Sequence, residues 1–339
     1  MVVFAWSGFP QYAARCVGAF VDQSSEGVSV IATRPAVPIH GMEQLCHCSV
    51  EWVEPDGITA IQINDVSTLI VSGWGIPIFD RLATSVRAAG GKVIAMVDNN
   101  FRPTIREYVR AIRFRLFLRR KFDAFFVPGR SSRRLLRFYG VPEEKIFEGV
   151  YSADGNLFHD GAPLAKREKR VVYVGQLVER KNVRRLCKAF NAANKLGEWT
   201  LELYGCGVLE GELRRDYESE TIHIHSFLQP EDLAVKYREA RVFCLPSLEE
   251  HWGVVVHEAA LSGCVLLLSD EIGAGEDFLD DANGLTFRAD DTYGLTSAFS
   301  IIFAMKNKEL EIAQLHSIEN SRRSGVNVFV STLRRICHG

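Results

Sequence analysis

Two glutamates, Glu250 and Glu258, have the spacing in this sequence that most clearly suggests chemistry. They follow an apolar run at 242–245, and Gly253 between them precedes a predicted helix at 254–262. Glu250 therefore falls in a loop and Glu258 in the helix. A carboxylate accepts two hydroxyl hydrogen bonds at once, which suits a polyol such as a sugar or a ribose. The helix start offers backbone N–H groups that can hold an anion. Without further context, a solvated glutamate and a surface ion pair would be the favoured interpretation.

A second segment, 173–182, carries a glycine and two adjacent cations. Gly175 follows an apolar run and would let the loop approach a phosphate group. Arg180 and Lys181 would neutralise the charge of such a group. They could therefore clamp a diphosphate, with Gln176 beside them. Without further context, a solvated Arg–Lys pair at the start of a helix is the favoured interpretation.

Other residue types give little support for a metal or a redox cofactor. Cys46-His47-Cys48 is the only close pair among the eight cysteines, and its one-residue gap is too short for a zinc knuckle. Gly205 belongs to a glycine pair, but Glu210 occupies the third glycine position of a dinucleotide fingerprint, which argues against NAD. The sequence contains no Asp-x-Asp, and we expect no metal site.

Apolar runs that alternate with amphipathic stretches indicate parallel strands joined by crossover helices. The predicted strands are 2–6, 28–32, 68–71, 92–97, 124–128, 171–174, 200–204, 221–225, 242–245, 265–269 and 285–287. The predicted helices are 12–21, 79–89, a long stretch after 104, 131–139, 183–196, 231–239, 254–262, 292–305 and 327–336.

A polar, charged stretch near the middle of the 339 residues suggests a division into domains. We predict an N-terminal Rossmann-like domain at 1–155, a linker at 156–169 and a C-terminal Rossmann-like domain at 170–325. The terminal helix at 326–339 is expected to pack back on the first domain. The predicted fold class is α/β, with two Rossmann-like doubly wound domains facing across a cleft that binds ligands.

The segment 245–263 resembles the E-x7-E signature of family 4 glycosyltransferases, which have the GT-B fold; His251-Trp252-Gly253 stands where Gly-Phe-Gly is common. In that family the first glutamate lies near the sugar hydroxyls of a nucleotide-sugar and the second near its ribose. The resemblance covers about 171–287, although the family often has arginine at the position of Gln176. It implies a donor site made of Gly175, Gln176, Arg180, Lys181, Gly205, Glu250, His251, Trp252, Gly253, Val254 and Glu258, with Glu250, Lys181 and Arg180 catalytic.

The resemblance implies that 170–325 is the nucleotide-sugar donor domain and that 1–155 is the acceptor-binding domain. Fewer residues carry the acceptor side. Gly8 and Phe9 occupy the place of the family's N-terminal glycine-rich loop, and Asp98 and Asn99 follow a later strand. We expect these four residues on the acceptor side. The cleft histidine that many members carry has no counterpart in 71–75.

The segment 102–137 holds twelve basic residues against two acidic ones in a chain of net charge −2. Ile105, Val109, Ile112 and Leu116 repeat at helical spacing. A second face of the same helix carries Arg106, Arg110 and Arg113. A basic amphipathic helix is typical of a membrane-surface element. The alternatives are a solvated face over the core and a site for an acidic acceptor.

The overall balance of charge argues against a nucleic-acid partner. The N-terminus lacks a signal-peptide pattern, and no apolar run is long enough to span a bilayer. We expect a cytoplasmic protein, peripheral on the inner face of the membrane. Its predicted activity is retaining, metal-independent transfer of a sugar from a nucleotide-sugar to a carbohydrate or lipid-linked acceptor, in polysaccharide, lipopolysaccharide or glycolipid synthesis. The nucleotide-sugar is then a substrate, and no cofactor is expected.

Two other functions are compatible with the same residues. A sugar-nucleotide epimerase of this fold would convert the donor without an acceptor, and a phosphorylase would need a cofactor lysine or phosphate site. A non-catalytic subunit that binds a sugar nucleotide is favoured by Gln176 and the missing histidine. The intact pair Glu250 and Glu258 opposes that interpretation.

Overall fold

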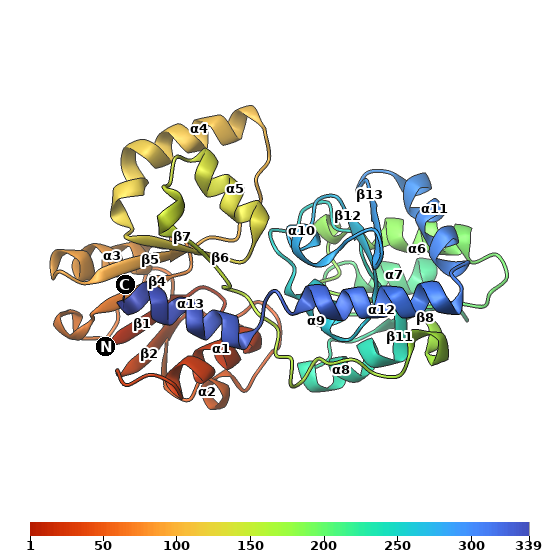
Figure 1. Ribbon diagram of the computed structural model, residues 1–339, viewed down its shortest axis with the longest axis horizontal. Coiled ribbons are helices and arrows are strands. Elements are labelled where there is room, and N and C mark those ends of the chain that lie inside the picture. Colours follow the sequence, from red (N-terminus) through yellow and green to blue (C-terminus); the bar gives the residue numbers. More distant parts are fainter. Residues whose placement is uncertain (339) are drawn as a thin grey trace. The chain divides into compact units, whose positions relative to one another are not determined.

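The computed structural model describes residues 1–338, which form two compact α/β units (Figure 1). Unit 1 consists of Met1–Ser152 together with the chain from Ser324 onward, and unit 2 is Ala153–Arg323. Each unit is built around one parallel sheet. Within residues 1–338, no helix combines the length and the apolar character needed to cross a membrane.

The sheet of unit 1 has seven strands in the order β3-β2-β1-β4-β5-β6-β7. All neighbours are parallel, and β1 lies between β2 and β4. Because helices cover both faces, the central strands are continuous apolar runs. The strands are β1 (Val2–Trp6), β2 (Val28–Ala32), β3 (Ser49–Trp52), β4 (Thr68–Val71), β5 (Lys92–Met96), β6 (Ala124–Val127) and β7 (Ile146–Glu148).

Two hydrophobic clusters lie on opposite faces of this sheet. One contains Phe4 and Phe126 with residues of α1 and the C-terminal helix α13, whose Phe329 ring stacks on Phe4 and packs at a tilt against Phe126. The other contains Phe125 with residues of α3, α4 and α5. The helices of unit 1 are α1 (Gln11–Val21), α2 (Met42–Leu45), α3 (Pro77–Ala88), α4 (Ile105–Arg113), α5 (Arg130–Phe138) and α13 (Val326–His338).

The sheet of unit 2 has six parallel strands in the order β10-β9-β8-β11-β12-β13. They are β8 (Glu168–Val174), β9 (Thr200–Tyr204), β10 (Ile222–His225), β11 (Ala240–Leu245), β12 (Val265–Ser269) and β13 (Gly284–Phe287). The helices are α6 (Val183–Ala193), α7 (Glu210–Tyr217), α8 (Pro230–Glu239), α9 (Val254–Leu261), α10 (Gly275–Phe278), α11 (Thr292–Phe303) and α12 (Asn307–Ser321).

The predicted α/β fold class is confirmed, and every predicted strand and helix is present with ends within three residues. The prediction missed β3, β7, α2, α7, α10 and α12. Helix α12 escaped detection because its buried face is made largely of small and polar residues, Ala313, Gln314, Ser317, Asn320 and Ser321. Such a face leaves little hydrophobic periodicity.

The segment 156–169, which we predict as a linker, lies within unit 2. Leu164 is buried, and its N–H donates to Gln314 Oε1 at 2.9 Å. The Arg167 guanidinium donates to the carbonyls of Tyr237 and Ala240 at 3.4 and 3.1 Å. These contacts give a polar segment a structural role that its composition does not reveal.

Helix α13 should contribute substantially to the stability of unit 1 through Phe329. Replacing this fully buried ring by alanine removes its contacts with Phe4 and Phe126. We expect Phe329→Ala to lower the free energy of unfolding by about 3–5 kcal/mol in urea titrations. Ser331→Ala, on the exposed side of the same helix, should change it by less than about 0.5 kcal/mol. Equal small effects would show that α13 is not part of the core.

Candidate functional site

The loops after β8 and β11 meet at the carboxyl edge of the sheet of unit 2. The chain continues from β8 toward β10 on one side and from β11 toward β13 on the other. The boundary between β8 and β11 is therefore a topological switch point, where doubly wound sheets bind ligands. The Leu248 N–H donates to the Arg180 carbonyl at 2.8 Å, and Asn182 Nδ2 donates to the Pro246 carbonyl at 3.1 Å.

An ion pair between Lys181 Nζ and Glu250 Oε2 joins these two loops. Ser247 Oγ also donates to this carboxylate oxygen at 3.4 Å, and Arg180 lies 4.0 Å from it. Lys181 is only 7% exposed. Burial lowers the pKa of Lys181, and Glu250 acts in the opposite direction by favouring the charged ammonium. The predicted diphosphate clamp and the predicted sugar-binding carboxylate are thus paired with each other. Arg180 also donates to Gln176 Oε1 at 3.3 Å.

The loop that carries Glu250 is held from a third side by the chain after β12. The Glu250 N–H donates to the Glu271 carbonyl, and the Gly273 N–H donates to the Glu250 carbonyl, both at 3.3 Å. Ser269 Oγ donates to the Ser247 carbonyl at 2.6 Å. Backbone contacts on both sides therefore fix the position of the Glu250 carboxylate.

Gly175 and Gly205 allow a close approach of the chain after β8 to the chain after β9. A Cβ at position 205 would lie 1.9 Å from the Gly175 carbonyl oxygen, which no side chain tolerates. Gly175 has a φ of 156° and Gly253 a φ of 92°, both in the region that favours glycine. The glycines at 175 and 205 thus have a packing role that the sequence alone did not suggest.

Glu258 lies on α9 and is only 8% exposed. The Tyr237 hydroxyl donates to Glu258 Oε2 at 3.1 Å. Burial raises the pKa of Glu258 to about 7, and this hydrogen bond opposes the shift. The alternative that Glu258 makes a surface ion pair is therefore wrong. Tyr237 lies 21 residues earlier on α8, and the sequence carried no local signal that the two would meet.

Three further residues of the predicted donor site lie at or just before the start of α9, which begins at Val254. Trp252 is buried, and its ring packs edge-on against Phe278 with centroids 5.7 Å apart. Among the described residues its indole N–H has no hydrogen-bond partner. His251 is half exposed, with its Nε2 3.5 Å from a Glu249 carboxylate oxygen.

The predicted acceptor-side residues lie at the carboxyl edge of the sheet of unit 1. The Gly8 N–H donates to Thr33 Oγ1 at 2.8 Å. Phe9 is fully buried against Trp6, so its side chain belongs to the core and only its backbone could face a ligand. Asp98 accepts a hydrogen bond from the Tyr151 hydroxyl, and burial raises the pKa of that hydroxyl well above its usual value.

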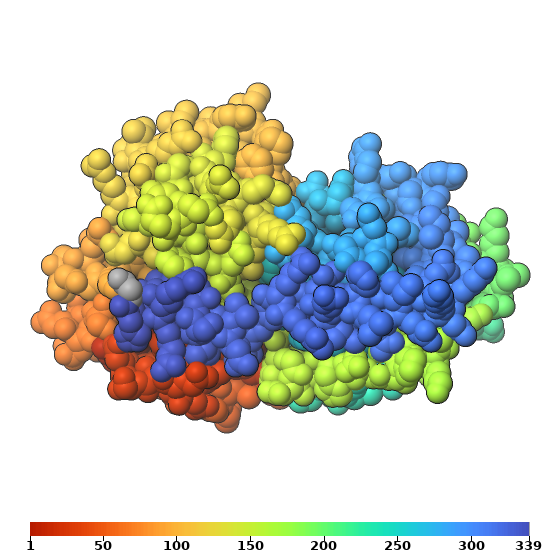
Figure 2. Space-filling model, viewed as in Figure 1, coloured from red at the N-terminus to blue at the C-terminus, as the bar shows by residue number. Residues whose placement is uncertain are grey.

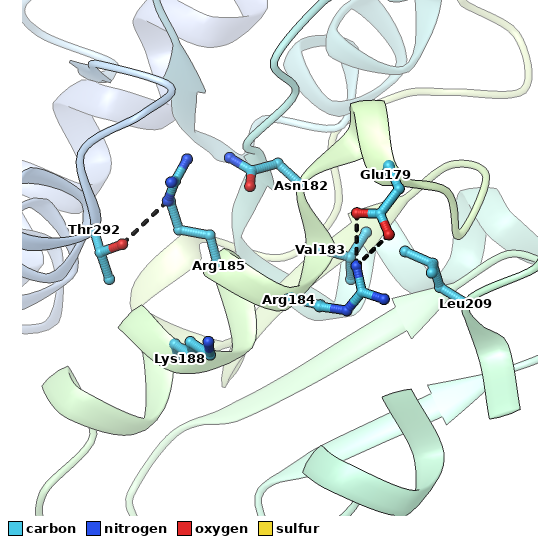
Figure 3. Close-up of a pocket in the computed structure, with 8 residues that line it drawn as sticks. All are labelled: Glu179, Asn182, Val183, Arg184, Arg185, Lys188, Leu209 and Thr292. Carbon is cyan, nitrogen blue, oxygen red and sulfur yellow. Dashed lines mark hydrogen bonds and ion pairs between the residues drawn. The ribbon is translucent and has the colours of Figure 1, made fainter. Parts of the chain in front are cut away.

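A pocket of about 210 Å³ lies at the start of α6 (Figure 3). Arg184 donates to both carboxylate oxygens of Glu179, and Arg185 donates to Thr292 Oγ1 at 3.1 Å. The pocket contains none of the predicted donor-site residues. Because ligands of doubly wound sheets bind at the switch point between β8 and β11, we place the candidate site there. Within residues 1–338, no group of three or more His, Cys, Asp or Glu side chains could hold a metal ion.

Residues 168–304 match the family model described as glycosyl transferases group 1. HepE of Anabaena in complex with UDP is 14% identical, covers 99% of both chains and gives a TM-score of 0.77. Sucrose-phosphate synthase of Thermosynechococcus elongatus is 16% identical. The match covers 99% of this chain and 98% of that one, with a TM-score of 0.76. A glycosyltransferase of Rickettsia africae is 11% identical to this chain. The match covers 99% of this chain and 97% of that one, with a TM-score of 0.76.

These comparisons support a glycosyltransferase with the GT-B fold. No curated protein sequence matches the chain. The family match spans β8 to α11 and contains Lys181, the loop that carries Glu250, and helix α9 with Glu258. The switch point described above therefore lies inside the matched region.

The raised pKa of Glu258 predicts a specific pH dependence of stability. The folded carboxyl has a pKa of about 7 against an ordinary value of 4.5, so the folded state binds more protons between these values. The contribution of Glu258 to stability is fully present below pH 4.5 and is lost as the pH rises through 7. Glu258→Gln should therefore gain stability relative to the wild type between pH 5 and pH 8, measured by urea unfolding. The same relative stability at both pH values would contradict the burial of an ionisable group.

Proposed function

We propose that the protein is a retaining glycosyltransferase of the family 4 type that transfers a hexosyl or related sugar from a nucleoside-diphosphate sugar. The observation that carries this proposal is the convergence of Lys181, Arg180 and Glu250 at the switch point of unit 2. The family match over residues 168–304 supports it. UDP is the first nucleotide to test, because HepE of Anabaena is solved with UDP and with UDP-glucose.

The ion pair suggests how the donor enters. Without a ligand, the Lys181 ammonium is balanced by Glu250. A diphosphate that reaches Lys181 and Arg180 supplies the same negative charge and releases the Glu250 carboxylate. That carboxylate is then free to accept hydrogen bonds from the sugar hydroxyls, while Glu258 accepts those of the ribose. Both charges stay compensated throughout, as a buried site requires.

The departing diphosphate is stabilised by the same cations. Lys181, Arg180 and the backbone N–H groups at the start of α9 offset the negative charge that develops as the bond to the sugar breaks. This arrangement needs no metal. Retention then follows from substitution on the face of the sugar that the leaving group vacates, without a protein nucleophile. The remaining contribution is the positioning of the acceptor.

An exposed apolar stripe on unit 1 supports a lipid-linked acceptor. Helix α4 continues as a π-helical stretch, Phe114–Leu118, and α4 is labelled in Figure 1. Six large apolar side chains of these two segments are more than half exposed: Ile105, Tyr108, Val109, Ile112, Leu116 and Phe117. Figure 2 shows the corresponding yellow region at the surface.

The charge beside this stripe favours an anionic membrane as its partner. Arg106, Arg110 and Arg113 are exposed on the same helix. Each cation near an anionic leaflet contributes about 1 kcal/mol to binding. We propose that α4 lies on the inner face of the cytoplasmic membrane, where the protein glycosylates a glycan or lipid-linked acceptor in polysaccharide, lipopolysaccharide or glycolipid synthesis. Gly8, Asp98 and Asn99 are the proposed acceptor-side residues.

Donor binding should depend on Glu258 and Lys181. Titration calorimetry with UDP-glucose in EDTA should detect binding to the wild type, because no metal is required. We expect Glu258→Ala to weaken it by about 1–3 kcal/mol, because two hydroxyl acceptors are lost from a desolvated site. Lys181→Ala should weaken the binding of both UDP and UDP-glucose, because it removes a cation that contacts the phosphates.

Glu220→Ala and Lys188→Ala are matched controls, since both side chains are exposed and lie outside the proposed contacts. Glu250→Ala should chiefly lower turnover, measured by mass spectrometry of products with a glycolipid extract. Unchanged donor binding in Glu258→Ala and Lys181→Ala would exclude the switch point as the donor site. If the sugar nucleotide is converted and no acceptor product forms, the protein is an epimerase. If the donor binds and no product of any kind forms, the protein is a non-catalytic subunit.

Membrane binding should depend on the charge of α4. The wild type should co-sediment with phosphatidylglycerol vesicles at low salt. Binding should fall steeply as the Debye length shortens from about 10 Å at 0.1 M to about 3 Å at 1 M. The triple variant Arg106→Glu, Arg110→Glu, Arg113→Glu should lose vesicle binding and keep UDP binding.

A triple variant with the same change of charge on unit 2, Arg215→Glu, Arg288→Glu, Arg322→Glu, is the control, because these arginines are exposed and belong to the other unit. It should bind vesicles like the wild type. If the wild type stays in the supernatant at low salt, or if both triple variants behave alike, α4 is not a membrane-binding element.

A further inference from the structure

Tyr237 is a buried polar residue that the proposed function does not use. It lies on α8, which packs against α9 in unit 2 (Figure 1). Its ring is fully buried, edge-on against Phe158 and tilted against Phe243, with centroids 5.9 and 5.8 Å apart. These contacts fix the ring, and with it the position of the hydroxyl group. A buried hydroxyl is stable where it makes a hydrogen bond.

The Tyr237 hydroxyl has two acceptors within reach on α9. Glu258 Oε2 lies 3.1 Å from the hydroxyl oxygen, and the Val255 carbonyl oxygen lies 3.5 Å from it. A tyrosine hydroxyl carries one hydrogen, and a carboxylate is a stronger acceptor than a carbonyl. The hydrogen therefore goes to Glu258, over the shorter of the two distances. Tyr237 thus holds one oxygen of this carboxylate.

The second oxygen of Glu258 stays available for a ligand. Among residues 1–338, no group donates a hydrogen bond to Oε1, and this oxygen is not fully buried. The residue as a whole is only 8% exposed, so its side chain has little room to turn. With one oxygen held and the other open, the carboxylate is oriented before a ligand arrives. Such preorganisation reduces the entropy that binding costs.

Tyr237 also favours the charged form of Glu258. Burial raises the pKa of Glu258 to about 7, and the hydrogen bond from Tyr237 acts against that rise. Helices α8, α10 and α12 and strands β11 and β12 pack against α9. Tyr237 is the one titratable group of these described elements that shifts the pKa of Glu258. On α9 itself, His257 faces Ala153 and Ser321. Near neutral pH, Tyr237 therefore increases the ionised fraction of Glu258, which is the better acceptor.

We propose that Tyr237 is a positioning residue that makes the donor site selective for ribose hydroxyl groups. This inference rests on the proposed function, in which Glu258 accepts the ribose hydroxyls of the nucleotide-sugar. Because Tyr237 holds Oε2, Glu258 presents Oε1 to the ribose in one orientation. A ribonucleotide is then bound more tightly than an analogue without ribose hydroxyls, because the analogue leaves a desolvated carboxylate without those donors.

The test compares UDP with its dideoxy analogue, which lacks both ribose hydroxyls, by titration calorimetry on the full chain. The wild type should bind UDP more tightly than the analogue. Tyr237→Phe keeps the buried ring and removes only the hydroxyl. It should bind UDP about three- to tenfold more weakly than the wild type and bind the dideoxy analogue as the wild type does. Tyr217→Phe, which removes a hydroxyl on α7 of the same unit, is the matched control and should leave both affinities unchanged.

Two further measurements separate positioning from a general structural role. In the Glu258→Ala background, Tyr237→Phe should have no further effect on UDP binding, because the carboxylate that the hydroxyl holds is gone. Without any nucleotide, Tyr237→Phe should raise the pKa of folded Glu258 further. A carboxyl with a raised folded pKa loses its contribution to stability as the pH rises through that pKa. In urea unfolding, Tyr237→Phe should therefore lose more stability relative to the wild type at pH 8 than at pH 5.

The outcomes distinguish this inference from the proposed function. If the wild type does not bind UDP, or if Glu258→Ala binds it unchanged, the proposed donor site fails and the inference fails with it. If Glu258→Ala weakens UDP binding, Tyr237→Phe decides the inference alone. The inference is overturned if Tyr237→Phe keeps the full preference for UDP, or weakens UDP and the dideoxy analogue by the same factor. An equal loss of stability at pH 5 and pH 8 would also overturn it.

Discussion

The ion pair between Lys181 and Glu250 is the interaction on which the candidate site depends. A buried ammonium is stable only when an opposite charge and hydrogen bonds compensate it. Glu250 supplies that charge, and Ser247 binds the same carboxylate oxygen. Because Lys181 follows β8 and Glu250 follows β11, the pair also fixes the spacing of the two loops at the switch point. Loss of Glu250 would leave the nearly buried Lys181 ammonium without its carboxylate partner.

Helix α9 links this site to both ends of unit 2. Glu258 points toward Tyr237 on α8, and the neighbouring His257 contacts other parts of the chain. His257 Nδ1 accepts from the Ala153 N–H, and its Nε2 donates to the Ser321 carbonyl, both at 3.0 Å. Burial lowers the pKa of His257 to about 4, so the ring is neutral and can accept at one nitrogen while it donates at the other. This short helix therefore carries the candidate ligand residue Glu258, and through His257 it binds the beginning of unit 2 at Ala153 and its end at Ser321.

Unit 1 shows that a helical pattern does not determine which face is buried. In α4 the buried residues are Glu107 and Ala111, while the large apolar residues face solvent. Glu107 can be buried because the Tyr139 hydroxyl donates to it and Arg110 pairs with it at 3.2 Å. A polar side chain thus takes the inward position because two specific partners satisfy it, and the apolar stripe becomes available for a membrane.

The sequence by itself determined the alternation of strands and helices, because buried parallel strands and amphipathic helices carry periodic hydrophobic patterns. It also indicated that Lys181 and Glu250 each follow a strand, and therefore lie at the same sheet edge. Only the tertiary structure decided that these two charges pair with each other, that Tyr237 meets Glu258, and that Phe9 belongs to the core. It also decided that α12 forms with a small and polar buried face. Contacts of this kind join residues far apart in the chain. Local sequence patterns do not predict which distant side chain will form the hydrogen bond or ion pair that a buried polar group needs.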